Sequence, residues 1–194
     1  IREQVPLARY VVPTVSYGAT VVNQARNWST SITGATADYF DTANWVLADG
    51  RVFTEAEQRG GRAVCVIGDT IRRELFGNEN PVGGALRIKS FSCEVIGVLR
   101  AKGQSAMGMD QDDTVVMPLR TVQRRLTGKT DVRTILVSLQ DGASSSEAMA
   151  QITALLRERR KLDEGQENNF SIMDARQIAE TMSGTTQVMT TLLG

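Results

Sequence analysis

Histidine is absent from this chain of 194 residues, and its absence limits the reactions that the chain can catalyse. Histidine is the commonest general base, the usual ligand of catalytic metals and the group that activates serine or cysteine nucleophiles. Net charge is lacking as well, because 22 basic side chains balance 22 acidic ones. No overall basic excess is available to recruit nucleic acid or an anionic membrane surface. The composition therefore disfavours most hydrolases and nucleic-acid-binding proteins.

Long apolar segments are also missing. No run approaches the roughly 20 apolar residues that span a bilayer. The N-terminus has neither an initiating Met nor the charged-then-apolar pattern of a signal peptide. The last residues, VMTTLLG, become more apolar just where the sequence stops, which suits a cut at the edge of a membrane helix. We expect the chain to be a segment of a longer protein.

Cysteine is scarce, with two residues in the chain. Cys65 and Cys93 lie inside the apolar runs AVCVIG and FSCEVIGVL, where a small hydrophobic thiol packs well. Two buried free thiols are the favoured interpretation. A disulfide between adjacent strands is the alternative, since bridging depends on Cβ geometry that the sequence does not reveal.

Alternating patterns and helix caps predict the elements of the first third. Apolar and polar residues alternate over 14–22 and 28–35 around a polar connection, which predicts a hairpin. A helical turn is expected over 38–42. Thr54 and Glu57 fit a capping box, and the helix that follows ends at the Gly60-Gly61 break.

The middle third begins with a continuous apolar run at 63–67, which predicts a buried strand. Gly68-Asp69 offers an N-cap for a helix over 70–76, and Gly77 is placed to end it. The same patterns predict strands at 85–88, 93–99 and 114–117 and a helix over 119–126.

The final third is predicted to form a compact α/β unit. A strand is expected at 135–139, followed by a helix that Ser144 and Glu147 cap and that runs to about Arg160. Its apolar stripe consists of Met149, Ile152, Leu155 and Leu156. A strand at 170–173 and an exit helix from Asp174 are expected to follow.

The order of elements predicts an α+β fold with two subdomains. The break near Gly60-Gly61 and the polar stretch 127–130 suggest a central segment inserted between two terminal pieces. We expect one subdomain from residues 1–58 and 131–194, and a smaller mixed α/β insertion over residues 59–130.

Two segments invite a functional interpretation. Gly68-Asp69-Thr70 follows a strand, as phosphate-binding loops do, but it lacks both glycine-rich nucleotide motifs, so an ordinary helix cap is favoured. The loop over 103–113 carries three acidic residues that resemble a site for a hard cation, yet their spacing fits no EF-hand. A solvated loop is favoured there, and we expect no catalytic, cofactor-binding or metal-binding residue in the chain.

The loop is also the best candidate for partner contacts. Methionines between glycines on a mobile segment suit adaptable binding, although core packing explains them equally well. The predicted partner-binding residues are Gln104, Met107, Met109, Asp110, Asp112 and Asp113.

The joint order of several segments resembles the periplasmic core domain of MacB-like ABC exporter permeases, a family of tripartite efflux pumps. The resemblance rests on the segments STSITGATADYF, LADGRVFTEAE, AVCVIGDTIRRELFG, NPVGGALRIK, CEVIGVL, KGQSAMGMDQDD, VMPLRTVQRRLTG, ILVSL and AQITALLRERR. It implies that the terminal subdomain is a porter-like βαβ unit. The N-terminal part is then expected to lack the first strand of the domain.

The resemblance also implies a role. Such a domain faces the periplasm within an inner-membrane permease, forms a homodimer in the parent transporter and docks a periplasmic adaptor and, through the assembly, an outer-membrane channel. It transmits ATP-driven conformational change without catalysing a reaction, so this chain is expected to need no cofactor, with ATP and Mg bound in the parent's nucleotide-binding domain. Cargoes in such families include macrolides, peptide toxins, siderophores and lipopeptides.

Two other functions stay open. A periplasmic small-ligand or lipoprotein-binding module would hold its ligand between the two subdomains. An enzyme with Cys65 or Cys93 as nucleophile would need Lys, Arg or a helix N-terminus to activate the thiol.

Overall fold

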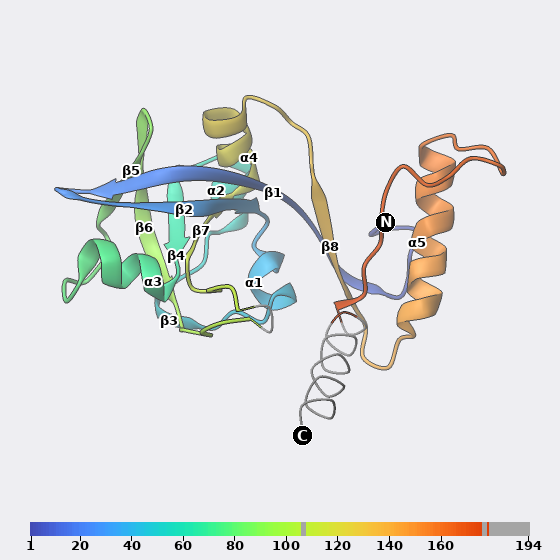
Figure 1. The fold of residues 1–194 in the computed structure, drawn as a ribbon, viewed down its shortest axis with the longest axis horizontal. Helices are drawn as coiled ribbons and strands as arrows, with labels where there is room; N and C mark the ends of the chain where they lie inside the picture. The colour runs from blue at the N-terminus through green and yellow to red at the C-terminus, as the bar shows by residue number, and fades with distance from the viewer. Residues whose placement is uncertain (106–107, 176–177, 179–194) are drawn as a thin grey trace, which may run out of the picture. The chain divides into compact units, whose positions relative to one another are not determined.

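The computed structural model describes residues 1–105, 108–175 and 178. The chain divides into two compact units, one of residues 10–137 and one of residues 1–9 with 138–194. The larger unit consists mainly of strands with short helices, and the smaller contains one long helix (Figure 1). Helices and strands both contribute, so the predicted mixed α+β class is confirmed.

A long hairpin runs through the start of the chain. β1 (Ala8–Asn23) and β2 (Arg26–Ala35) pair antiparallel, with Val15 opposite Gly34 and Asn23 opposite Arg26. Gln24, in the two-residue turn, has a positive φ of 52°. The predicted hairpin is confirmed, and both strands extend further into the polar connection than the alternation indicated.

The strands of the larger unit form a closed circuit. β2 pairs parallel with β7 (Thr114–Pro118), and β7 pairs antiparallel with β4 (Val64–Ile67). β4 pairs parallel with β6 (Phe91–Leu99), and β6 pairs antiparallel with β5 (Ala85–Ile88). β5 returns to β1 at Val21 and Val22, so the path closes a small barrel (Figure 1). β3 (Leu47–Gly50) pairs with β6, and β8 (Thr134–Leu139) pairs with β1.

Apolar side chains fill the barrel and cover part of its outside. Ile32, Ile67 and Leu86 belong to one fully buried cluster. Val66 and Val116 belong to a second cluster, which also contains Phe40 and Phe53, with ring centroids 5.4 Å apart. Successive residues of β4 therefore enter different clusters, because strand side chains alternate between faces. Burial on both faces explains why the run VCVI is continuously apolar.

Two strands of the barrel are each followed by a short helix, and the two strand–helix segments are alike. β4 leads into α3 (Asp69–Ile71) and a π-helical turn, η1 (Arg72–Phe76). β7 leads into α4 (Leu119–Val122) and a second π-helical turn, η2 (Gln123–Thr127). Both segments end at a glycine with positive φ, Gly77 at 61° and Gly128 at 66°. The predicted helices are confirmed, although their π-helical second halves were not indicated by the sequence.

Two further short helices, α1 (Asp38–Thr42) and α2 (Glu55–Gly60), precede β4. The Thr54 hydroxyl accepts from the Glu57 amide at 3.2 Å, and the Glu57 carboxylate accepts from the Thr54 amide at 2.7 Å, so the predicted capping box is confirmed. Arg51 donates to both carboxylate oxygens of Glu57 at 2.9 Å. These hydrogen bonds from Arg51 are the main reason that the pKa of Glu57 is lowered to about 2.

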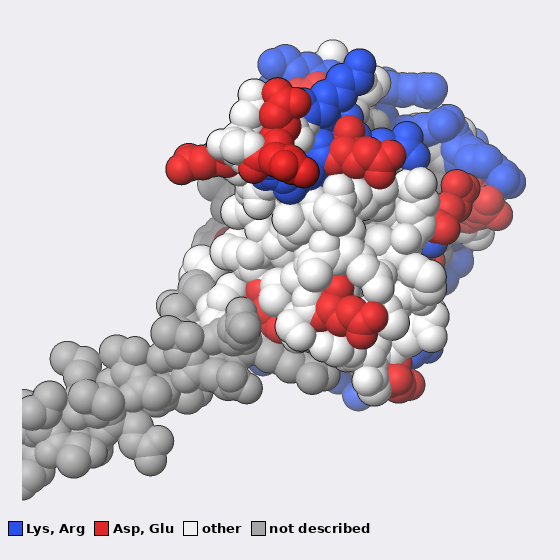
Figure 2. All heavy atoms as spheres, turned by 90° about the vertical axis from the view of Figure 1, so that its right-hand side faces the viewer, with Lys and Arg blue, Asp and Glu red and all other residues white. Residues whose placement is uncertain are grey.

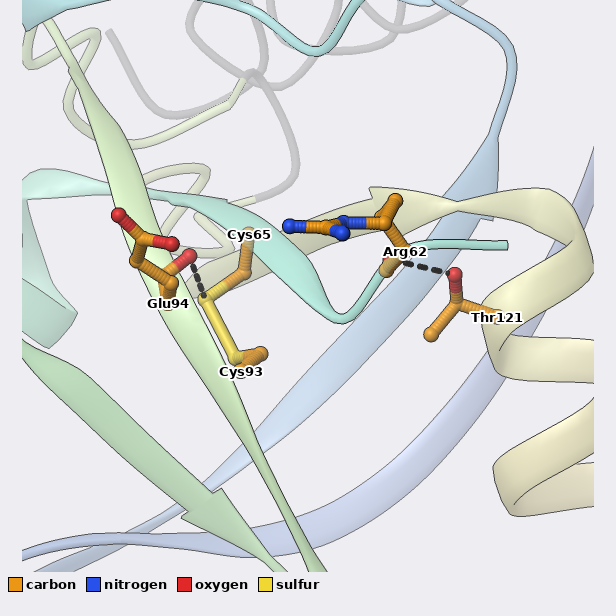
Figure 3. Close-up of a disulfide and its surroundings, with 5 residues drawn as sticks. All are labelled: Arg62, Cys65, Cys93, Glu94 and Thr121. Carbon is orange, nitrogen blue, oxygen red and sulfur yellow. Dashed lines mark hydrogen bonds between the residues drawn. A yellow bond between two sulfur atoms is a disulfide. The ribbon is translucent and has the colours of Figure 1, made fainter. Parts of the chain in front are cut away.

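A disulfide joins Cys65 and Cys93 in the barrel core (Figure 3). The cysteines lie on the neighbouring strands β4 and β6 with their Cα atoms 6.0 Å apart, and both are fully buried. The favoured prediction of two free thiols is therefore wrong, and the disulfide alternative is confirmed. Parallel pairing of β4 and β6 brings the two residues within bridging range, and that pairing is not a local property of the sequence.

The smaller unit is organised by α5 (Ser145–Arg159). Ser144 caps it by accepting from the Glu147 amide at 3.3 Å, and Ile152 and Leu155 are buried, as predicted. Cations gather in its last turn, where they complement the helix dipole. Figure 2 shows the face that carries α5, with a largely uncharged centre and with Lys and Arg side chains interspersed with Asp and Glu toward the top.

The segment after α5 is held by arginines of the helix end. Arg157 donates to the carbonyl oxygens of Asp163 at 2.6 Å and Gln166 at 2.8 Å. Arg160 donates to the Asn169 side chain at 2.8 Å, and its guanidinium lies 5.5 Å from the Phe170 ring centroid. The strand predicted at 170–173 is wrong, because these residues are not in a strand and Phe170 instead lies under the Arg160 guanidinium. The exit helix predicted from Asp174 falls almost wholly outside the described residues.

The compact units differ from the predicted division of the chain. That division grouped residues 1–58 with 131–194 and set residues 59–130 apart. Residues 10–58 instead share a unit with 59–130, since β2 pairs with β7 and Phe53 packs in the cluster of Val66. The porter-like character assigned to the terminal pieces stays a prediction.

Candidate functional site: the loop between β6 and β7

The connection from β6 to β7 folds into a tight loop with a cross-bridged base. Its two arms approach each other at an isolated bridge between Gln104 and Asp110. The Gln111 amide donates to the Gly103 carbonyl at 3.1 Å, and the Ser105 amide donates to the Met109 carbonyl at 2.8 Å. The arms are therefore paired with each other, and we call the described residues at their outer end, Gln104, Ser105, Gly108 and Met109, the tip.

Asp112 anchors the base of the loop from inside. Its carboxylate accepts hydrogen bonds from the backbone amides of Lys102 at 2.8 Å and Gly103 at 2.9 Å, and the residue is 4% exposed. A carboxylate that accepts two amides in a buried position holds the backbone in one conformation. Asp112 therefore orders the loop, and its carboxylate is turned away from solvent.

The other two predicted acids tie the loop to neighbouring elements. Asp110 accepts from the Thr70 hydroxyl of α3 at 2.6 Å and from the Asp112 amide at 2.8 Å. The hydrogen bond from Thr70 is the main cause that lowers the pKa of Asp110. Asp113 accepts from the indole nitrogen of Trp28 on β2 at 3.0 Å. All three acids therefore make structural hydrogen bonds within the barrel unit.

Gly68 allows the loop to lie close to the end of β4. A Cβ atom at this position would stand 2.0 Å from the carbonyl oxygen of Asp112. The Gly68 amide also donates to the Thr114 carbonyl at 2.9 Å. The Gly68-Asp69-Thr70 segment thus combines the predicted helix cap with a close backbone contact to the loop.

The tip is where the loop meets solvent. Met109 is 62% exposed, and Gln104 is exposed beside it. Met107 lies outside the described residues. Of the six predicted partner-binding residues, the structure thus leaves Gln104 and Met109 free at the surface and uses the three acids as anchors. The assignment of a partner to this loop stays a prediction.

The connection between α1 and β3 lies against the base of the loop. The Lys102 ammonium lies 4.0 Å from the centroid of the Trp45 ring and donates to the Ala43 carbonyl. Burial of this ammonium lowers the pKa of Lys102. Val46 beside them is 52% exposed. No local signal in the sequence links Trp45 or Thr70 to the loop.

Among the described residues, no three His, Cys, Asp or Glu side chains are placed together to hold a metal ion. The disulfide leaves no free thiol, so the proposed cysteine nucleophile is wrong. A hollow of about 320 Å³ beside α3 is lined by residues that include Asp69, Arg72 and Glu79. Arg72 is already engaged there by Asp69 at 2.8 Å.

No helix among the described residues is long and apolar enough to cross a bilayer.

A family model described as the MacB-like periplasmic core domain matches residues 1–155. The macrolide export ATP-binding/permease protein MacB of Chlorobium phaeobacteroides is 36% identical over 180 residues, covering 93% of this chain and 27% of that protein. MacB of Syntrophobacter fumaroxidans is 31% identical over 247 residues, covering 100% of this chain and 34% of that protein. The chain therefore spans about a third or less of these relatives.

Solved structures agree in fold. The periplasmic region of MacB from Actinobacillus actinomycetemcomitans superposes with a TM-score of 0.77 at 25% identity, covering 92% of this chain and 77% of that one. The extracellular domain of the transporter YknZ from Gram-positive bacteria gives a TM-score of 0.69 at 20% identity, covering 84% and 81% of the two chains.

Proposed function

The chain belongs to the family of MacB-like periplasmic core domains of ABC transporter permeases, and we propose that it docks a periplasmic adaptor and transmits ATP-driven conformational change within a tripartite efflux assembly. In this proposal the parent permease is a homodimer of the inner membrane. ATP and Mg bind in its nucleotide-binding domain, and an outer-membrane channel completes the assembly.

The anchored loop carries the proposal. Asp110, Asp112 and Asp113 fix its base through hydrogen bonds to α3, to its own backbone and to β2. A base held at three points presents the tip without the entropy cost of ordering a free loop. Met109 at the tip is exposed, and methionine adapts to irregular apolar surfaces. These features suit a contact with another protein better than chemistry on a small molecule.

The strands support a mechanical role. The backbone passes between the two compact units twice, inside β1 (Ala8–Asn23) and inside β8 (Thr134–Leu139). Paired strands resist extension through their hydrogen bonds, whereas a flexible linker absorbs displacement as entropy. Both crossings therefore lie within strands and not in a flexible linker, and this is the feature of the chain that suits a mechanical role.

The disulfide supports a periplasmic location by an independent route. Buried disulfides form and persist in oxidising compartments such as the bacterial periplasm and are rare in the cytosol. Cys65 and Cys93 are both fully buried, so their bridge is a structural one.

Adaptor binding by the full chain tests the role of the loop. Immobilised adaptor from the same operon or genome is titrated with wild type, with the double variant Q104S/M109S, and with M173S as the control. Met173 is the more exposed methionine, at 77%, and lies in the other unit. We expect Q104S/M109S to weaken binding about tenfold, which is roughly 1.4 kcal/mol, with an unchanged unfolding midpoint. Equal affinities for all three proteins would overturn the assignment.

A further inference from the structure

A group of exposed arginines lies at the end of the barrel where β4 begins and β7 ends. Arg62 precedes β4, and Arg120, Arg124 and Arg125 follow β7 on α4 and η2. We call these four residues the arginine patch. Because β4 and β7 run antiparallel, the patch lies at one end of this strand pair, and the loop between β6 and β7, which contacts Gly68, lies at the other end.

Hydrogen bonds bring the two segments of the patch together. The Thr121 hydroxyl donates to the Arg62 carbonyl at 2.8 Å, and Arg120 donates to the Arg59 carbonyl at 2.9 Å. The guanidinium of Arg124 comes within 3.5 Å of the position that a Cβ on Gly61 would occupy. The side chains of Arg120 and Arg124 thus converge on the segment that enters β4, whereas the Arg125 guanidinium lies 5.8 Å from the centroid of the Phe91 ring at the start of β6.

The patch has no acidic partner among the described residues. Glu57 of the adjacent helix α2 is bound by Arg51, and Glu55 is bound by Arg59. Arg120 and Arg124 stand four residues apart on consecutive helical turns, where like charges repel and cost a few tenths of a kcal/mol. The fold therefore maintains a concentrated positive charge that its own acids do not neutralise, even though the whole chain has no net charge.

An open strand edge adjoins the patch. Gln123 of η2 donates to the carbonyls of Thr130 at 2.9 Å and Asp131 at 3.3 Å, which fixes the approach to β8. β8 is the last strand in the sheet order and has one neighbouring strand, β1, in the part of the chain that the structure describes. Val132 and Ile135 are 40% and 44% exposed along this stretch. The unpaired backbone groups of β8 and these exposed aliphatic side chains thus lie next to the arginine patch.

We propose that the arginine patch and the outer edge of β8 dock an extended, acidic segment of a partner protein. Guanidinium groups match carboxylates through paired hydrogen bonds, and an open edge accepts a strand through its backbone. Arginine beside exposed aliphatic side chains is also typical of protein interfaces. A phospholipid headgroup would use the guanidiniums but not the strand edge, so a polypeptide uses more of this surface than a membrane does. The surface is separate from the loop tip, so both can be occupied together.

Binding of a defined peptide to the full chain tests the proposal. The probe is a peptide of about 12 residues with alternating Glu and Val, labelled for fluorescence anisotropy, at about 50 mM and about 300 mM salt. We expect R62Q/R124Q/R125Q to weaken binding at least about tenfold. The control R26Q/R73Q/R100Q also removes three positive charges, but from exposed arginines outside the patch. We expect this control to change the affinity for the peptide less than about twofold. Arg120 is retained because it donates to the end of α2.

Amide hydrogen exchange gives a second readout that net charge alone does not change. With bound peptide, the amides of residues 131–137 are expected to exchange more slowly, because a strand added at β8 protects them. Equal weakening by the two triple variants, or binding without protection of 131–137, would overturn the proposal. So would binding of wild type to phosphatidylglycerol vesicles but not to the peptide, since that result would assign the surface to a membrane.

Discussion

The hydroxyl of Thr70 donates to the carboxylate of Asp110 across 2.6 Å, and this contact joins α3 to the loop between β6 and β7. The two residues are 40 positions apart in the sequence. Thr70 is 4% exposed, so the hydrogen bond is shielded at the donor. The helix that follows β4 thereby helps to position the proposed docking loop.

Replacing Thr70 by valine should loosen the loop. The change keeps the shape of the side chain but leaves Asp110 without its main hydrogen-bond donor, so we expect the free energy of unfolding to fall by about 1–2 kcal/mol. The pKa of Asp110 should rise toward its ordinary value. Urea unfolding and an NMR titration of the carboxyl group measure the two effects. Thr20→Val, at an exposed hydroxyl on β1, should change stability by less than about 0.5 kcal/mol.

Gly68→Ala should be strongly destabilising, because the added Cβ would meet the Asp112 carbonyl oxygen at 2.0 Å and the backbone must shift. We expect a loss of about 2 kcal/mol or more, measured as a lower midpoint in urea. Gly18→Ala is the matched control, since no atom lies within 4 Å of the added methyl group. Equal effects of the two substitutions would show that the close contact with Asp112 does not constrain the fold.

Reduction of the disulfide should lower stability without altering any other side chain. The bridge spans 28 positions, and a loop of that length corresponds to about 3–4 kcal/mol in the chain-entropy model. We expect the urea midpoint of reduced wild type to fall accordingly. The protein must be unfolded before reduction, because both cysteines are fully buried. Coincident unfolding curves for the oxidised and reduced forms would contradict this expectation.

Glu57 should make the free energy of unfolding depend on pH in the acidic range. Its pKa is about 2 in the folded state and about 4.3 when unfolded, so its contribution is complete above about pH 4.3 and is lost as the pH falls toward 2. Glu57→Gln should lower the free energy of unfolding by about 1 kcal/mol at pH 7, a value that allows for solvent screening. The difference from wild type should shrink to near zero at about pH 2. A gap that stays constant across this range would mean that Arg51 and Glu57 do not act as an ion pair.

Local signals made most of the secondary structure predictable. The capping box of Thr54 and Glu57, the helix end at Gly77 and the buried strand at Val64–Ile67 follow from neighbouring residues alone. Each is set by backbone geometry or by hydrogen bonds that close within a few positions. The strand predicted at 170–173 failed because Arg157 and Arg160 decide the course of that region through side chains.

Apart from β3 and the strand wrongly expected at 170–173, the sequence by itself therefore determined the order of the elements, together with the α+β class and the family resemblance that the comparisons confirmed. Tertiary structure decided the rest. It closed β5 onto β1, joined Cys65 to Cys93 and converted Asp110, Asp112 and Asp113 from an acidic loop into three anchors. The physical reason is distance along the chain. The closure of β5 onto β1, the disulfide and the hydrogen bonds that Asp110 and Asp113 accept from Thr70 and Trp28 join residues tens of positions apart, and those residues meet only once the barrel has closed.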